Sequence, residues 1–271
     1  MQFGARTDTG RVRENNEDSY RVAPEINLFV LSDGMGGQAS GEVASRLAAE
    51  TIIAHCREAC ENPSLALAGT PVEGVSDTSN RLASAIRLAN KVVNEEANKD
   101  ESRHGMGATV VAVWIADGRM SLAHVGDSRI YRLRGSEFEQ LTQDHSFVAE
   151  QVRRGLITEQ EARESKMQSV LLRALGIEPE VEVALDEQLV MDGDVVLLCS
   201  DGLTRELSDE QISGVLGEIK DAKAAADRLV DLAKDAGGGD NITAIVIGQS
   251  RKRMGFLARL ASWFEGSEVP S

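Results

Sequence analysis

Two apolar runs of this chain end in the same tripeptide, Ser-Asp-Gly, and this repetition constrains fold and chemistry more than any other feature. Residues 28–34 and 195–202 each pass from hydrophobic residues into that tripeptide, with Asp33 and Asp201 at its centre. A third carboxylate, Asp240, follows three glycines and precedes another apolar run. A buried strand fixes an Asp at its tip, and a glycine after it lets its own carbonyl approach the same ion. Converging carboxylates repel one another unless a divalent cation neutralises them, so the pattern predicts a hard-metal hydrolase.

The composition limits the classes of partner. The chain has 271 residues, of which 42% are hydrophobic, enough for one large domain or two small ones with a substantial core. Its net charge is −15, from 44 acidic and 29 basic residues. Such a charge repels nucleic acid and anionic membranes and attracts metal ions or basic segments of partners, so no nucleic-acid partner is expected.

The expected location is the cytoplasm. The three cysteines do not form a disulfide framework, and we interpret Cys56, Cys60 and Cys199 as small core residues in a reducing compartment. The N-terminus has no charged region followed by an apolar one, so no signal peptide is expected. No apolar run approaches the roughly 18 residues that a membrane-spanning helix needs.

Hydrophobic periodicity predicts a chain of class α+β, with helices layered on sheets. Thr158 opens a capping box, Ser208 is a helix N-cap, and Asp117-Gly118 is a hairpin turn. The strand predicted at 109–115 is apolar on both faces and is expected to be covered on both sides. Helices are predicted over 41–59, 78–98 and 222–236, helical patterning over 144–176, and further strands over 28–31, 120–125, 130–133, 138–141, 195–199 and 242–247.

The last residues differ in character from the rest, so we divide the chain into a domain, 1–249, and a basic, amphipathic tail, 250–271. Three cations at 251–253 precede apolar residues at helical spacing, among them Leu260 and Trp263. This pattern is typical of a helix that lies in a membrane interface, but also of one that docks on the domain or on a partner. We favour docking because the charge of the domain opposes anionic membranes.

Several short motifs occur in one order along the chain. Any single Asp-Gly is common, but the ordered set resembles the metal-dependent Ser/Thr protein phosphatase family (PPM, type 2C) in its bacterial form, over about residues 5–247. The motifs are Arg13 with Asn16-Glu17-Asp18, Asp33-Gly34-Met35-Gly36-Gly37, Gly107-Ala108-Thr109, Gly126-Asp127-Ser128-Arg129, Ser200-Asp201-Gly202-Leu203-Thr204 and Gly239-Asp240-Asn241-Ile242-Thr243.

The resemblance implies a four-layer α-β-β-α sandwich with two central antiparallel sheets, a phosphatase domain over 1–249 and a flap beside the active site at about 145–176. It also implies a binuclear centre of Mn²⁺ or Mg²⁺. Asp33 would bridge the two ions. The Gly34 carbonyl would complete one shell, which Asp18 reaches through water, and Asp201 and Asp240 would hold the other ion.

Two further residues match the family in role. Asp127, together with Asp201, matches a third, weaker metal position of bacterial members, and its alternative role is to end a strand. Arg13 matches the arginine that grips the substrate phosphate; its alternative is an ordinary surface arginine. Where eukaryotic relatives carry a His as general acid, this chain has Met35. The proton donor to the leaving group is therefore not identified.

The expected chemistry follows from the ligand types. Two metal ions about 3.5–4 Å apart clamp the attacking and leaving oxygens of an in-line displacement and activate a water. Oxygen-only ligation selects Mg²⁺ or Mn²⁺ over zinc. No nucleophilic side chain is required, so Ser32, Ser200 and Cys199 are expected to be structural.

The predicted function is hydrolysis of phosphoserine and phosphothreonine on proteins, opposing a Ser/Thr kinase in bacterial signalling. One alternative is a catalytically silent regulator of the same fold that binds phosphoproteins. Another is a phosphatase of anti-sigma-factor antagonists, which the absence of an attached sensor domain disfavours.

Overall fold

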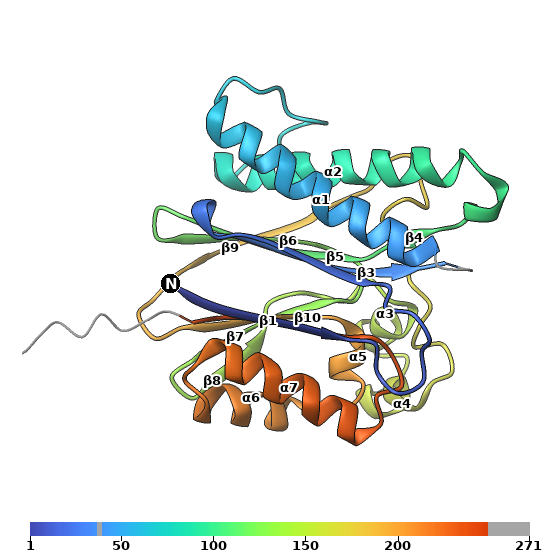
Figure 1. Ribbon diagram of the computed structural model, residues 1–271, viewed down its shortest axis with the longest axis vertical. Coiled ribbons are helices and arrows are strands. Elements are labelled where there is room, and N and C mark those ends of the chain that lie inside the picture. The colour runs from blue at the N-terminus through green and yellow to red at the C-terminus, as the bar shows by residue number, and fades with distance from the viewer. Residues whose placement is uncertain (37–39, 249–271) are drawn as a thin grey trace, which may run out of the picture.

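The computed structural model describes residues 1–36 and 40–248. Two antiparallel sheets pack face to face, and helices cover the outer face of each (Figure 1). The predicted four-layer α-β-β-α sandwich is confirmed. The predicted tail, 250–271, lies outside the described residues, as does the boundary at 249.

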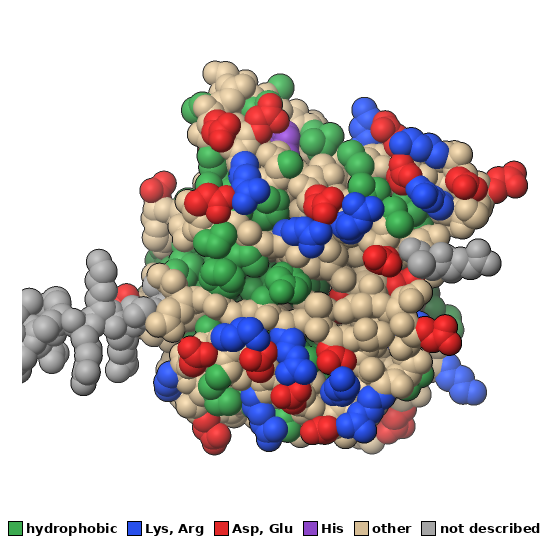
Figure 2. Space-filling model, in the orientation of Figure 1, with side chains coloured by type: hydrophobic (Ala, Val, Ile, Leu, Met, Phe, Trp, Pro, Cys, Tyr) green, Lys and Arg blue, Asp and Glu red, His purple; other side chains and the backbone are tan. Residues whose placement is uncertain are grey.

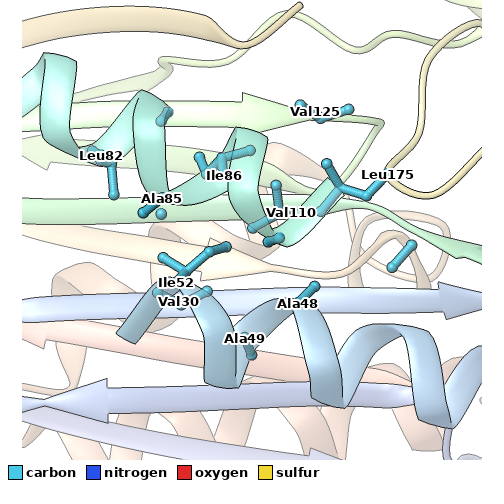
Figure 3. Packing of buried hydrophobic residues seen from close by; sticks show 14 of the residues in the cluster. Val30, Ala48, Ala49, Ile52, Leu82, Ala85, Ile86, Val110, Val125 and Leu175 are labelled. Carbon is cyan, nitrogen blue, oxygen red and sulfur yellow. The ribbon is translucent and has the colours of Figure 1, made fainter. Parts of the chain in front are cut away.

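The first sheet is covered by two long helices, α1 (Ser40–Glu61) and α2 (Asp77–Ala97). Ala48 and Ile52 of α1 and Ile86 of α2 pack on Val30 and Val110 of this sheet (Figure 3). Its strands lie in the order β2 (Asp18–Ala23), β3 (Leu28–Met35), β5 (Val110–Ala116), β6 (Arg119–Val125) and β9 (Ala184–Leu189), with the short β4 (Gly107–Ala108) paired to β3.

The second sheet is covered mainly by α6 (Asp209–Glu218) and α7 (Ala222–Ala236). A short helix, α5 (Asp201–Thr204), follows directly after its central strand β10. The strand order is β1 (Gln2–Asp8), β11 (Ile242–Gly248), β10 (Val195–Cys199), β7 (Arg129–Arg134) and β8 (Glu137–Gln140).

Strand β5 is buried on both faces, as its composition predicted. Val110 and Ala112 belong to the core under α1 and α2, whereas Val111 and Val113 belong to the core between the sheets. The pleat alternates side chains between the two faces of the strand, so a strand between two apolar layers must be hydrophobic throughout.

Most predicted elements are confirmed, including the capping box that begins at Thr158 and the N-cap at Ser208, which also forms a capping box with Gln211. Four strands escaped prediction. In the edge strands β1, β2 and β9, polar residues interrupt the apolar pattern, and β4 has only two residues. The segment 144–176 is only partly helical, with α3 (Phe147–Arg153) and α4 (Glu159–Glu164) in otherwise irregular chain. The 3-10 turns Pro24–Ile26 and Glu101–Arg103 complete the elements.

The expectation that all three cysteines are core residues is only partly confirmed. Cys56 and Cys199 are buried, but Cys60 is exposed, because it lies at the end of α1 beyond the stripe that faces α2. Within residues 1–36 and 40–248, no helix combines the length and the apolar character that crossing a bilayer requires.

Candidate metal centre

Carboxylates from both sheets converge on a single cavity of about 180 Å³. Asp33 stands near the end of β3, and Asp127 follows β6 in the same sheet. Asp201 opens α5 after β10, and Asp240 precedes β11 in the other sheet. The cavity is lined by these four residues together with Arg13, Glu17, Gly34, Met35, Gly36, Thr109, Ser169, Leu171, Arg205 and Asn241.

Asp18 lies beside this cavity rather than in its lining. It is the cross-strand partner of Asp33 in the β2–β3 pair. Its Oδ2 accepts hydrogen bonds from the Ser200 hydroxyl at 2.8 Å and from the Thr243 hydroxyl at 2.6 Å. Its Oδ1 is buried and has no hydrogen-bond partner among the residues that the structure describes. Burial raises the pKa of Asp18 to about 7, against the opposing effect of the two hydroxyl groups.

Asp33 is fixed through its backbone by Thr109. The Asp33 N–H donates to the Thr109 hydroxyl at 3.2 Å, and the Thr109 N–H donates to the Asp33 carbonyl at 2.8 Å. Burial raises the pKa of the Asp33 carboxyl well above its usual range, and the charges of Asp18 and Asp201 raise it further. Unscreened carboxylates of this kind favour either a bound proton or a bound cation.

Gly34 is required by close approach between backbones. A Cβ at this position would lie 2.1 Å from the carbonyl oxygen of Gly41, in the first turn of α1. The Gly34 N–H donates to the carbonyl of Glu17 at 3.0 Å. The glycine after Asp33 therefore lets α1 begin directly against the end of β3, at the wall of the cavity.

Two arginines bind the carboxylates of the second sheet. Arg13 binds Asp240 with two parallel contacts, Nε to Oδ1 and Nη2 to Oδ2, each 2.9 Å long. Arg205 forms an ion pair with Asp201 across one helical turn, and its Nη1 lies 3.3 Å from Asp240 Oδ2. Arg205 was not among the residues predicted for the site. Its only sequence signal is the spacing of four residues from Asp201.

Asn241 holds the loop that carries Arg13. Its side-chain oxygen accepts from the Glu17 N–H at 2.8 Å, and its amide donates to the carbonyls of Thr9 and Asn15. The first residues of β11 thus fix the loop between β1 and β2 beside Asp240. The Asp-Asn pair was recognised only as part of a motif, and the role of the amide could not be read from it.

Asp127 stands in a turn supported by two histidines. It is 8% exposed, and burial raises its pKa to about 8, with the charges of Asp201 and Asp144 adding to the effect. The N–H of Gly126 donates to Nδ1 of His145, whose ring stacks on that of His124 at a centroid distance of 4.6 Å. Both histidines support the backbone, because Nε2 of His124 also contacts the carbonyl of Gln143 at 2.9 Å.

The donor set fits hard cations, although the side chains are not yet arranged around one. In the described part of the chain, no three acidic, His or Cys side chains surround a single point closely enough to hold an ion. Arg13 and Arg205 engage oxygens of Asp240 and Asp201. The buried, unpaired Oδ1 of Asp18 and the carboxylate oxygens of Asp33, Asp127, Asp201 and Asp240 are nevertheless the kind of ligand that Mn²⁺ or Mg²⁺ requires.

A family model described as protein phosphatase 2C matches residues 9–236 of this chain. The serine/threonine protein phosphatase PstP of Mycobacterium tuberculosis is 39% identical over 246 residues, 91% of this chain and 44% of that protein. The serine/threonine phosphatase stp of Listeria monocytogenes is 34% identical over 250 residues, 91% of this chain and 95% of that protein. This chain thus spans less than half the length of the mycobacterial relative.

Solved structures show the same fold. The catalytic domain of PstP, in complex with two manganese ions, superposes with a TM-score of 0.76 at 38% identity. The match covers 90% of this chain and 96% of that one.

Proposed function

Because the chain belongs to the protein phosphatase 2C family, we propose that it hydrolyses phosphoserine and phosphothreonine on proteins, with two Mn²⁺ or Mg²⁺ ions as cofactor. The observation that carries the proposal is the convergence of Asp33, Asp127, Asp201 and Asp240 with Arg13 on one cavity. Two relatives named as Ser/Thr phosphatases and a manganese-bound structure of the same fold support it.

The roles that we propose for the acidic residues follow their positions. Asp33, between the carboxylates of both sheets, would hold both ions, and the Gly34 carbonyl would join it. Asp201 and Asp240 would hold one ion from the second sheet, and Asp18 would act from behind Asp33 through its unpaired Oδ1. Asp127 would supply a third, weaker position. When bound, the ions supply Lewis acidity to the phosphoryl oxygens and lower the pKa of a water.

Arg13 has a different task. Its guanidinium already makes a two-pronged contact with a carboxylate, and a phosphate offers two oxygens of the same spacing. We propose that Arg13 exchanges Asp240 for the substrate phosphate when Asp240 turns to a metal ion. Its side chain is 54% exposed, so the exchange needs no rearrangement of the core.

A silent, phosphoprotein-binding regulator is the second candidate, and one observation favours it. Arg13 and Arg205 form ion pairs with Asp240 and Asp201. If these ion pairs persisted when metal ions are supplied, Asp240 and Asp201 would not hold a cation, and a bound phosphoprotein would not be hydrolysed. The opposing Ser/Thr kinase and the cytoplasmic location stay predictions.

The test is release of phosphate by the full chain from a phosphoserine, a phosphothreonine and a phosphotyrosine peptide, with Mn²⁺, with Mg²⁺ and with a chelator. We expect hydrolysis of the first two peptides that depends on the added metal. Binding of the phosphopeptides without any phosphate release, at every metal concentration, would favour the silent regulator.

A further inference from the structure

An open groove of about 700 Å³ separates the edges of the two sheets and extends from Phe3 to Asp18, at the margin of the candidate metal centre. One wall is β1 and the other is β2, the outermost strands on this side. Figure 2 shows a hydrophobic patch at mid-height on this face, where Figure 1 places the sheet edges. Phe3 is 41% exposed there, and Ala5, Tyr20 and Val22 are only partly buried.

The apolar side chains of the groove border the hydrophobic core between the sheets and are only partly buried. Phe3 packs edge-on against Phe29 at a centroid distance of 5.6 Å, and Ala5, Tyr20 and Val22 border the same inter-sheet cluster. The cations at its margin, Arg21 and Lys223, are paired with Glu50 and Asp227. Thr7, Asp18 and Ser19 line the polar part of the groove, whereas the part around Phe3, Tyr20 and Val22 is apolar and favours an apolar occupant over a charged one.

The chain leaves the described structure beside this groove. Gly248, the last residue of β11, is the register partner of Gln2 at the start of β1. Residues 249–271 therefore start one strand away from the end of the groove at which Phe3 and Val22 lie. An occupant covalently attached at this point has a high effective concentration.

We infer that the C-terminal tail covers this groove as an amphipathic helix, with Phe256, Leu260 and Trp263 facing Phe3 and Tyr20. A helix over 254–264 is about 16 Å long at the usual rise per residue. The groove follows β1 from Phe3 to Thr7, about 14 Å of extended strand. The tail thus matches the groove in length, its apolar residues match the part around Phe3 and Tyr20, and the residues between Gly248 and Met254 suffice to turn the chain back.

Tryptophan fluorescence of the full chain tests this inference. The only other tryptophan, Trp114, is buried, so the difference between wild type and Trp263→Phe isolates the tail signal. We expect Trp263 to emit at short wavelength and to be shielded from acrylamide. Phe3→Glu should shift this emission to the red and remove the shielding. Leu189→Glu also replaces an exposed apolar residue by Glu, but on the edge strand β9, and should leave the emission and the shielding of Trp263 unchanged.

A second pair of variants changes only the tail, so it tests the inference even if Phe3→Glu does not fold. Leu260→Glu, on the apolar face of the tail, should release Trp263, whereas Ala258→Glu, on the opposite face, should not. A solvent-exposed Trp263 in wild type, or shielding that survives both Phe3→Glu and Leu260→Glu, would overturn the inference. Shielding that grows with protein concentration, or that appears only with anionic vesicles, would assign the tail to a second copy or to a membrane instead.

Discussion

Asp18 and Asp33 lie directly opposite each other on the antiparallel strands β2 and β3, yet only Asp33 lines the cavity. Two hydroxyl groups, from Ser200 and Thr243 of the other sheet, hold one oxygen of Asp18 and leave the second without a partner. The pair therefore joins the two sheets and supplies a buried, unpaired carboxylate oxygen to the site.

This burial predicts how the stability of the metal-free protein depends on pH. Folding raises the pKa of Asp18 from its ordinary 3.8 to about 7. The folded state thus retains a proton that the unfolded state releases, and the free energy of unfolding falls as pH rises between these values. Asp18→Asn removes this penalty and retains an acceptor oxygen for Ser200 and Thr243.

We expect the free energy of unfolding of Asp18→Asn to equal that of wild type near pH 4 and to exceed it above pH 7 by an amount on the order of a few kcal/mol. Urea unfolding in the presence of a chelator measures this, with Asp117→Asn at a hairpin turn as the control. Parallel pH profiles of Asp18→Asn and wild type would show that Asp18 is ionised in the folded protein.

Arg13→Ala separates substrate binding from metal binding. The loss of a charge-assisted, two-pronged contact is expected to weaken inhibition by inorganic phosphate roughly 10–100-fold. Affinity for Mn²⁺, measured by calorimetry, should not fall, because Arg carries no metal-ligand atom. Arg11→Ala, in the same loop and paired with Asp235 at the surface, is the matched control. A variant that loses Mn²⁺ affinity would place Arg13 in the support of the metal site.

Gly34→Ala tests the contact between β3 and α1. Its Cβ would collide with the Gly41 carbonyl, and relief requires a shift of backbone, so we expect a loss of more than about 2 kcal/mol in the free energy of unfolding. Gly214→Ala is the control, because this glycine of α6 has open space around it. That change should raise stability by about 0.5–1 kcal/mol. Equal effects of the two changes would contradict the close approach.

Asp127→Ala tests the weaker metal position. We expect calorimetry to show two bound Mn²⁺ ions and the activity on phosphopeptides to be lost, because Asp127 is buried in the cavity wall, where it would hold the third, weaker ion. Asp192→Ala, an exposed Asp-Gly turn before β10, should change neither quantity. Full activity of Asp127→Ala would reduce Asp127 to the residue that ends β6.

The sequence was sufficient to predict the helices and strands that have a local hydrophobic pattern. Helices α1, α2 and α7 and the buried strands β3, β5, β10 and β11 carry uninterrupted apolar periodicity, and the motif order indicated how they assemble. The edge strands β1, β2 and β9 carry mixed residues, because one side of each lacks a neighbouring strand. The pairing partner of β1 is β11, which lies more than a hundred residues further along the chain, so no local pattern indicates this pairing.

The same division applies to the site. Asp33, Asp201 and Asp240 were identifiable because each abuts an apolar strand, and the structure brings all three to one cavity. Arg205, Asn241 and Thr243 were not, because their importance lies in contacts to distant segments such as the loop that carries Arg13. The ion pairs of Arg13 with Asp240 and of Arg205 with Asp201 likewise could not be predicted from the sequence.

The most direct test of the central claim compares two Asp-Gly positions that differ only in their place in the fold. Asp33→Asn changes a carboxylate of β3 that lines the cavity together with carboxylates of both sheets. Asp117→Asn changes a residue of a hairpin turn whose φ of 50° suits Asn equally well. Phosphate release from a phosphoserine peptide is measured for both across a Mn²⁺ titration. We predict background rates for Asp33→Asn even at saturating Mn²⁺ and wild-type rates for Asp117→Asn. A wild-type rate for Asp33→Asn would contradict a metal-dependent phosphatase built on this residue.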